Sequence, residues 1–154
     1  MLISIGADHA GFVLKESVKA HLEAAGHTLT DVGAHSEESV DYPVVAEQVG
    51  CAVADGTAEF GVLVCGTGLG MAIAANKVDG VRAVQVGTPA FAEMSRRHND
   101  ANVVTLAGRS LSDEEAFAVV DTFLGTEFEA GRHQRRVDQI TAIESAGNCN
   151  CPSV

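Results

Sequence analysis

The sequence predicts an α/β fold: a Rossmann-like αβα sandwich with a five-stranded parallel sheet and an extra C-terminal helix. Short runs of β-branched residues alternate with longer amphipathic segments, which is the pattern of repeated strand–helix units. The run Gly61–Cys65 is almost entirely apolar, as expected of a strand buried on both faces. With 154 residues, 46% of them hydrophobic, the chain suits one domain with a substantial core.

The expected strands are apolar or β-branched runs bounded by turn-forming residues: Leu2–Ala7, Thr28–Val32, Gly61–Cys65, Val81–Val86 and Val103–Ala107. Helices are expected after each strand: Phe12–Ala25, Tyr42–Ala54, Leu69–Lys77, Pro89–Arg97 and Ser112–Leu124. A further helix, His133–Ser145, follows the last strand–helix unit. Because it comes after the sheet is complete, we expect it to extend towards a partner subunit.

Several helix ends have local signals. Gly26 can end the first helix in a left-handed conformation, and Pro43 suits the first turn of the second. Ser112, followed three residues later by Glu115, forms a capping-box pattern. The apolar face of the first helix is expected to contain Phe12, Val18, Leu22 and Ala25.

The composition excludes several classes of function. The chain contains 10 Lys and Arg against 21 Asp and Glu, a net charge of −11. A surface of this sign repels nucleic acids and anionic membranes, so we expect neither as a partner. No stretch approaches the ~20 apolar residues of a membrane span, and the first residues lack the features of a secretory signal. We therefore expect a cytoplasmic protein.

We expect residues 1–146 to form a single domain and residues 147–154 a flexible polar tail. The four cysteines lie in dissimilar contexts and indicate no disulfide framework. Cys149 and Cys151 could bind a metal or oxidise, but the tail around them offers no obvious further ligands. We interpret them as part of the tail and predict no metal site.

Two turns that follow expected strands contain reactive side chains. Asp8 and His9 could transfer a proton or bind an anion, although an Asp cap beside an exposed His is the simpler structural interpretation. Cys65 ends the buried strand, and three alternating glycines follow it in residues 66–70. Such glycines let backbone N–H groups converge on an anion at the start of a helix, which would also favour the thiolate. A buried structural Cys before a flexible turn is the alternative.

This glycine turn differs from the common nucleotide sites. Its pattern is G-x-G-x-G rather than G-x-G-x-x-G, and no acidic residue ends the next strand to hold a ribose hydroxyl. The chain also lacks G-x-x-x-x-G-K-[ST]. These differences argue against NAD and against a P-loop nucleotide.

Basic and polar residues gather in the last third of the chain. His98 lies in a polar segment before a strand, where a structural and a functional role are both open. Arg132 and Arg136 are four residues apart, so in a helix they share a face and could hold a phosphate. An exposed basic helix end is the alternative. The acidic balance of the remaining chain favours a specific small anion.

A comparison with known families rests on seven short segments of the sequence: Asp8–Gly11, Asp41–Pro43, Cys65–Gly70, Ala74–Lys77, Gly80–Ala83, His98–Val103 and Gly131–Val137. Together, in uninterrupted order over about residues 2–144, they resemble the type B ribose-5-phosphate isomerases. That family also contains galactose-6-phosphate isomerase subunits. No single segment is decisive, but seven in the right order are specific.

The resemblance implies an aldose–ketose isomerase that uses an enediolate and needs no metal or organic cofactor. Cys65 resembles the base that moves a proton between C1 and C2, whereas some relatives use a Glu where this chain has Met71. His98 resembles the residue that opens the furanose ring, with Asp8 assisting. The backbone positions that resemble the anion hole for the enediolate are Gly66, Thr67, Gly68, Leu69 and Gly70. The resemblance also makes Thr67 a candidate catalytic residue.

The resemblance also implies the remaining ligands. Asn99 resembles a ligand of a sugar hydroxyl, while Asp41 and Tyr42 are expected at the pocket mouth. The positions that resemble phosphate ligands are His9, Arg109, Arg132 and Arg136. Because the family builds each site from two subunits, we expect a homo-oligomer, a dimer or a tetramer, with a shared site.

A phosphorylated sugar is the expected small-molecule partner. Ribose 5-phosphate and ribulose 5-phosphate are the leading pair, with allose 6-phosphate, galactose 6-phosphate and a tetrose phosphate as alternatives. A non-catalytic sugar-phosphate sensor on the same fold is the alternative from another class. The presence of both Cys65 and His98 argues against the sensor.

Overall fold

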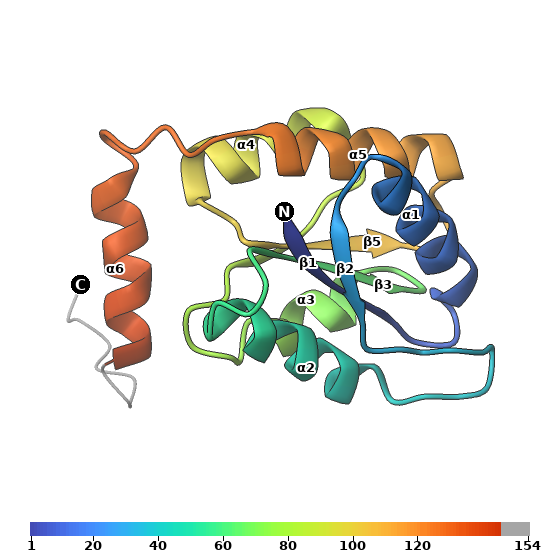
Figure 1. The fold of residues 1–154 in the computed structure, drawn as a ribbon. Coiled ribbons are helices and arrows are strands. Elements are labelled where there is room, and N and C mark those ends of the chain that lie inside the picture. Colours follow the sequence, from blue (N-terminus) through green and yellow to red (C-terminus); the bar gives the residue numbers. More distant parts are fainter. Residues whose placement is uncertain (146–154) are drawn as a thin grey trace.

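A computed structural model, which describes residues 1–145, confirms the αβα sandwich (Figure 1). The parallel sheet has the order β2-β1-β3-β5-β4. Its strands are β1 (Leu2–Ala7), β2 (Thr28–Asp31), β3 (Phe60–Cys65), β4 (Ala83–Gln85) and β5 (Val103–Ala107). The helices are α1 (Phe12–Ala24), α2 (Tyr42–Ala54), α3 (Leu69–Ala75), α4 (Pro89–Asn99), α5 (Asp113–Gly125) and α6 (Gln134–Ser145). The expected tail, with Cys149 and Cys151, lies outside the described residues.

Helix α6 lies apart from the layered body in Figure 1. The Glu144 carboxylate accepts a hydrogen bond from the Gly80 N–H at 3.0 Å, which ties the helix to the loop before β4. Val137 is buried, while Ile140 and Ile143 are exposed. Among the described residues, no helix is long and apolar enough to cross a membrane.

The expected elements are all present, and the largest differences in their limits occur around β4. The expected strand Val81–Val86 shortens to Ala83–Gln85 because the Arg82 N–H bonds to the Asn102 side chain instead of the neighbouring strand. The expected helix Leu69–Lys77 ends at Ala75, and the next residue, Asn76, bonds to both backbone groups of Ala83. Helix α4 continues two residues further than expected, so His98 and Asn99 belong to its last turn.

Local signals at helix ends are confirmed. Gly26 follows α1 with φ +88°, and Pro43 lies in the first turn of α2. Ser112 and Glu115 exchange both bonds of the capping box. The expected buried face of α1 is wrong in part, because neither Phe12 nor Ala25 is buried. The buried residues of this helix are Leu14, Lys15, Val18 and Leu22.

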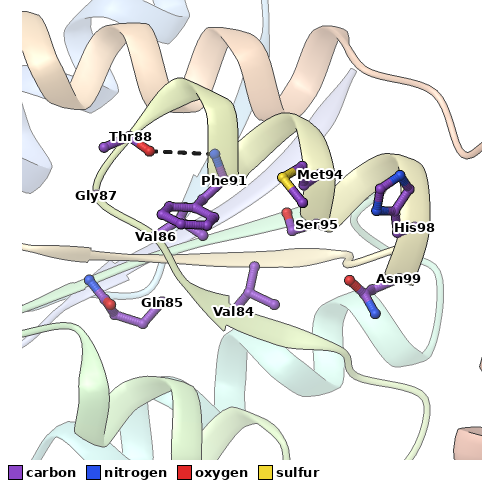
Figure 2. A pocket seen from close by; sticks show the side chains of 10 residues that line it. All are labelled: Val84, Gln85, Val86, Gly87, Thr88, Phe91, Met94, Ser95, His98 and Asn99. Atoms are coloured by element: carbon purple, nitrogen blue, oxygen red, sulfur yellow. Dashed lines mark hydrogen bonds between the residues drawn. The ribbon is translucent and has the colours of Figure 1, made fainter.

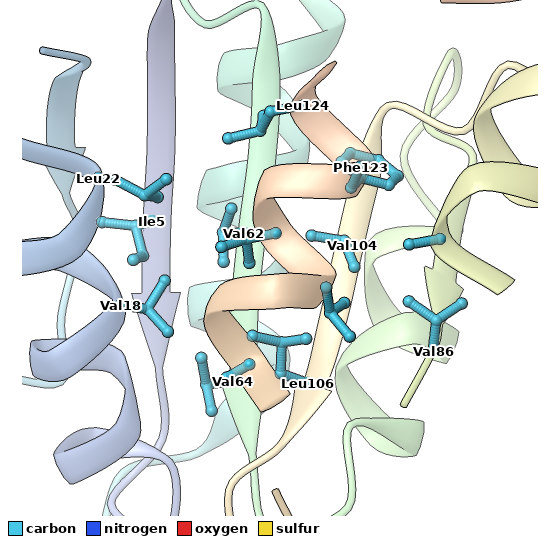
Figure 3. Packing of buried hydrophobic residues seen from close by; sticks show 14 of the residues in the cluster. Ile5, Val18, Leu22, Val62, Val64, Val86, Val104, Leu106, Phe123 and Leu124 are labelled. Carbon is cyan, nitrogen blue, oxygen red and sulfur yellow. The ribbon is translucent and has the colours of Figure 1, made fainter. Parts of the chain in front are cut away.

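Successive side chains of β3 point to opposite faces of the sheet and contribute to two apolar layers. Val62 and Val64 face α1, α4 and α5, in the cluster that Figure 3 shows. Leu63 and Cys65 face the opposite way, towards α2 and α3. All four side chains are buried, as expected of a central parallel strand. The last residue of β3 therefore projects its thiol towards the start of α3.

Lys15 is wholly buried and connects α1 to the β2 edge of the sheet. Its ammonium lies 2.8 Å from an Asp31 oxygen and donates to the Ala34 carbonyl at 2.9 Å. A buried ammonium needs such partners, since an unpaired one costs several kcal/mol, roughly 3–5. Burial opposes ionisation of Asp31, but hydrogen bonds from Lys15 and Lys19 lower the pKa of its carboxyl overall.

The turn after β1 packs directly on the end of β3. A Cβ added to Gly11 would lie 2.3 Å from the Val64 carbonyl oxygen and 2.9 Å from the Cys65 nitrogen. Only glycine permits this approach of two backbones. The contact brings the Asp8–His9 turn beside Cys65.

Acidification should weaken the fold through Asp31. Its folded-state pKa is lowered, so the unfolded chain binds more protons and the stabilisation disappears as pH falls below about 4. We expect Asp31→Asn to lower the free energy of unfolding at pH 7 and to reduce its dependence on pH between 5 and 3. Urea unfolding at each pH measures both. Glu37→Gln, at an exposed carboxylate, is the control, and an unchanged pH dependence in Asp31→Asn would contradict the prediction.

Gly11→Ala should destabilise the protein by about 1–3 kcal/mol, because the added Cβ overlaps backbone atoms that cannot move aside cheaply. Gly125→Ala is the matched control, since a Cβ there meets nothing within 4 Å and helix propensity favours alanine. Urea midpoints compare the two variants. Equal midpoints would show that the turn tolerates a side chain and that the close approach is not required.

Candidate active site

A cavity of about 310 Å³ lies at the carboxyl ends of β1, β3 and β5. The turns after these three strands meet here, as parallel α/β sheets require of a ligand site. It is lined by Asp8, His9, Ala10, Tyr42, Cys65, Gly66, Thr67, Gly70 and Arg109. The structure thus brings together eight of the residues that the sequence singles out. Ala10 is the additional one.

Cys65 lines this cavity, and only 4% of its surface is exposed. The Gly68 N–H donates to its sulfur at 3.1 Å. Gly68 adopts φ +75°, a left-handed conformation that glycine enters without steric cost. Leu69 and Gly70 then begin α3. The thiol therefore faces a backbone donor that can stabilise its ionised form.

Asp8 has a structural role in the first turn. One of its oxygens accepts hydrogen bonds from the N–H groups of Ala10 and Gly11, both at 2.9 Å. These bonds close the turn before α1, whose N-cap residue, Gly11, receives no side-chain capping bond, so Asp8 holds the turn rather than capping the helix. The carboxylate nevertheless lines the cavity, and its second oxygen accepts no hydrogen bond from the described residues.

His9 accepts a hydrogen bond at Nδ1 from the Val40 N–H at 3.4 Å. A neutral ring in this arrangement has its proton on Nε2. No hydrogen bond within residues 1–145 engages that nitrogen. His9 is therefore oriented to donate from Nε2 to a ligand in the cavity.

Arg109 extends over Gly66, where an added Cβ would lie 3.2 Å from its Nε. Ion pairs with carboxylates engage three other arginines: Arg82, Arg96 and Arg97. No such pair within the described part of the chain engages Arg109, Arg132, Arg135 or Arg136. In a protein with a twofold excess of acids, unpaired guanidinium groups are available to an external anion.

Tyr42 closes one side of the cavity. A Cβ on Gly70 would meet its ring at 2.8 Å, so the ring lies against the start of α3. Asp41 is the N-cap residue of α2, although its side chain accepts no capping hydrogen bond. Of the two expected residues at the mouth, the structure places Tyr42 in the cavity lining.

His98 and Asn99 do not join this cavity. They lie at one end of a separate groove of about 650 Å³ between β4 and α4 (Figure 2). Cys65 pairs with Ala107 at the end of β5, whereas α4 ends just before Val103 at its start. The four steps along β5 from Val103 to Ala107 span about 13 Å, and this length separates the end of α4 from Cys65. A single chain therefore divides the expected site into two parts.

The second part centres on a stacked pair of imidazoles. The rings of His98 and His133 lie 4.3 Å apart and within 9° of parallel. The Glu129 carboxylate lies 3.8 Å from the former and 3.7 Å from the latter. Burial, with His98 and Arg132 nearby, lowers the pKa of His133, which favours its neutral form. The sequence did not indicate Glu129, because no motif residue lies beside it.

These three side chains do not suit a divalent metal, although their ligand atoms lie within 4.8 Å of one another. Parallel rings direct their lone pairs in parallel planes rather than towards one point. The Arg97 guanidinium also pairs with Glu129 and lowers the pKa of its carboxyl. This ion pair already neutralises the negative charge that would attract a metal cation.

Arg136 lies in the first turn of α6, on the same side as this second part, whereas Arg132 lies in the turn before the helix, so the two do not share one helix face as expected. The Arg132 Nε donates to His133 at 3.3 Å, and Arg136 donates to the Arg132 carbonyl at 2.9 Å. Neither lines the Cys65 cavity. The expected phosphate ligands are therefore divided too: His9 and Arg109 lie with Cys65, and the other two with His98.

Known proteins share both the sequence and the fold. The profile of the Ribose/Galactose Isomerase family matches residues 3–140. Ribose-5-phosphate isomerase B of Escherichia coli is 49% identical over 146 residues, which are 95% of this chain and 98% of that protein. Ribose-5-P isomerase B of Listeria innocua is 38% identical and is aligned over 94% of this chain and 97% of its own.

Solved structures agree. Ribose-5-phosphate isomerase B of Clostridium thermocellum superposes with a TM-score of 0.94 at 44% identity, covering 96% of this chain and all of that one. The enzyme of Mycoplasma genitalium, with bound ribulose-5-phosphate, gives 0.90 at 40% identity, covering 94% and 96%. The profile match, the sequence identity and the superposition all point the same way: the chain belongs to the ribose/galactose isomerase family and is an isomerase.

Proposed function

We propose that this sugar-phosphate isomerase interconverts ribose 5-phosphate and ribulose 5-phosphate, with Cys65 as the base. One observation carries the proposal: a buried thiol with a backbone donor lies in the same cavity as an unpaired guanidinium, that of Arg109. A base beside an anion subsite is what a phosphorylated sugar needs. The names of the E. coli and M. genitalium relatives support the pentose as substrate.

The proposed reaction begins with the open-chain aldose. The Cys65 thiolate takes the C2 proton, and the electron pair of that bond forms the C1–C2 double bond of an enediolate with its charge on O1. The thiol then returns the proton to C1 while a proton passes from O2 to O1, which leaves the carbonyl at C2. Donors around the nascent oxyanion, among them the Thr67 hydroxyl and the N–H groups of residues 66–70, lower the barrier.

We assign the preceding and accompanying steps to groups from both parts of the divided site. His98, with Asp8, opens the furanose ring, and Asn99 holds a sugar hydroxyl. The phosphate binds His9, Arg109, Arg132 and Arg136. Its binding energy holds the reacting carbons beside the base without taking part in the chemistry.

These roles require a second copy of the chain. The separation of about 13 Å along β5 keeps His98 away from Cys65 of its own chain. A partner related by a twofold axis supplies the missing half to each cavity. The exposed Phe91 and Met94 of the β4–α4 groove, and the exposed Ile143 of α6, are apolar surfaces suited to such a contact.

The proposed base predicts that Cys65→Ala lowers turnover of ribose 5-phosphate at least about 100-fold, because general-base catalysis is lost, while ribulose 5-phosphate still binds. An isomerase assay measures turnover of ribose 5-phosphate by the variant and turnover of C4, C5 and C6 sugar phosphates by the wild type. Calorimetry measures the binding of ribulose 5-phosphate. Cys51→Ala, at an exposed cysteine of α2, is the control and should keep wild-type turnover.

The outcomes separate the alternatives. Turnover by Cys65→Ala near the wild-type value would contradict the thiol mechanism. Preference for a C4 or C6 substrate would replace the pentose with a tetrose, allose or galactose phosphate. Binding by the wild type without exchange of the C2 proton into D2O would identify a sensor.

The shared site predicts complementation between two inactive variants. In a mixed dimer of Cys65→Ala and His98→Asn, one site has both intact residues and the other has neither. Random mixing makes half of all dimers mixed, so co-refolding should restore about a quarter of the wild-type activity. A mixture of Cys65→Ala with the double variant is the control and stays inactive. Mixed dimers that form, as native mass spectrometry detects, yet remain inactive would contradict a shared site.

A further inference from the structure

We propose that Thr105 is a positioning residue for the Cys65 thiol and acts on it through Gly68; this rests on the proposed function, in which that thiol moves the proton. Thr105 lies in the middle of β5 and is wholly buried. No segment of the sequence that indicated the site includes it. Its hydroxyl faces the layer of α2 and α3, the same layer as Cys65.

Gly68 bridges the two side chains. The Thr105 hydroxyl donates to the Gly68 carbonyl at 2.8 Å, and the Gly68 N–H donates to the Cys65 sulfur at 3.1 Å. Both bonds are buried. The threonine and the thiol thus hold opposite ends of one residue.

Gly68 has little room to move between them. A Cβ at this position would lie 2.8 Å from Cγ of Gln85 and 3.1 Å from the carbonyl carbon of Leu106. The residue is therefore pressed against β4 and β5. Its left-handed backbone gives the turn a shape that an extended or helical peptide would not adopt.

The threonine bond is not needed to satisfy the Gly68 carbonyl. That oxygen also accepts the first bond of α3, from the Ala72 N–H at 3.1 Å. Replacing Thr105 by valine removes the hydroxyl and leaves the carbonyl paired. Because no buried polar group is then orphaned, the protein should fold normally. What the variant loses is one of the two hydrogen bonds that hold the Gly68 carbonyl, and with it part of the restraint on the orientation of Gly68.

That orientation matters to the thiol. A donor aimed at a developing charge stabilises it most when it need not reorganise. Without the Thr105 bond, the Ala72 N–H alone holds the Gly68 carbonyl, and a small shift of Gly68 turns its N–H away from the sulfur, so that the charge on sulfur is stabilised less. The effect falls on the proton-transfer step rather than on substrate binding, because Thr105 touches neither the cavity nor a phosphate ligand.

The test compares Thr105→Val and Thr105→Ser with Ser4→Ala. Ser4 is a matched control: its hydroxyl is buried on the same face of the sheet but has no hydrogen-bond partner among the described residues. Three quantities are measured: kcat and KM for ribose 5-phosphate, the rate of Cys65 alkylation by iodoacetamide at pH 7 from peptide mass spectrometry, and the urea midpoint.

We expect Thr105→Val to lower kcat about tenfold, the value of one hydrogen bond, with KM changed less than twofold. Alkylation of Cys65 should slow several-fold. Thr105→Ser, which keeps the hydroxyl, should stay within about twofold of the wild type. Ser4→Ala should change neither rate.

Several results would overturn the proposal. Thr105→Val with wild-type alkylation, a rise in KM alone, or an equal loss in Ser4→Ala would each do so. If Thr105→Val fails to fold, Thr105→Ser decides, since slow alkylation despite its hydroxyl would exclude the bridge, and wild-type alkylation would support it. Absence of isomerase activity in the wild type would contradict the proposed function instead, and the alkylation rates would still judge Thr105.

Discussion

The parallel direction of the strands is the constraint on which the site depends. Because all five strands run the same way, their carboxyl ends share one edge, and the turns after β1, β3 and β5 must meet there. The contact of Gly11 with the end of β3 makes this meeting close. Because β4 and β5 are parallel, α4 between them must return the chain to the opposite edge of the sheet before β5 begins. His98 is separated from Cys65 by the topology, and no side-chain rearrangement within one chain removes that distance.

Charge is arranged in a related way. Aspartates pair with the basic residues that stabilise the fold: Asp31 with Lys15 and Lys19, and Asp100 with Arg82 and Arg96. Within residues 1–145, the guanidinium groups without a carboxylate partner lie at the Cys65 cavity or in and just before the first turn of α6. An average charge of −11 therefore conceals two small basic regions, one on each part of the divided site. Guanidinium groups without carboxylates are chemically suited to the phosphate that the proposed function assigns to them.

Sequence patterns predicted what depends on neighbours in the chain. Periodicity gave the helices and strands, and Ser112 with Glu115 gave a helix start. Burial of Lys15 could not be predicted, because its partner Asp31 becomes adjacent only when β2 joins the sheet. Glu129 is only four residues from His133, but His98 comes beside it only in the folded chain. The resemblance grouped Cys65 with His98, but only the strand register reveals that they lie at opposite ends of β5.

The packing around α3 is consistent with the proposal that a thiol is the base. The resemblance implies that some relatives use a glutamate where this chain has Met71, and here the Met71 side chain is wholly buried in the layer that contains Val45, Leu63 and Ala75. A carboxylate in this layer would lose its hydration without gaining a partner, which raises the cost of its charged form. A thiol at the end of β3 avoids that cost, because it reaches the cavity and already has the Gly68 N–H as a donor. The apolar environment of Met71 therefore favours the proposed thiol at position 65 over a carboxylate on α3.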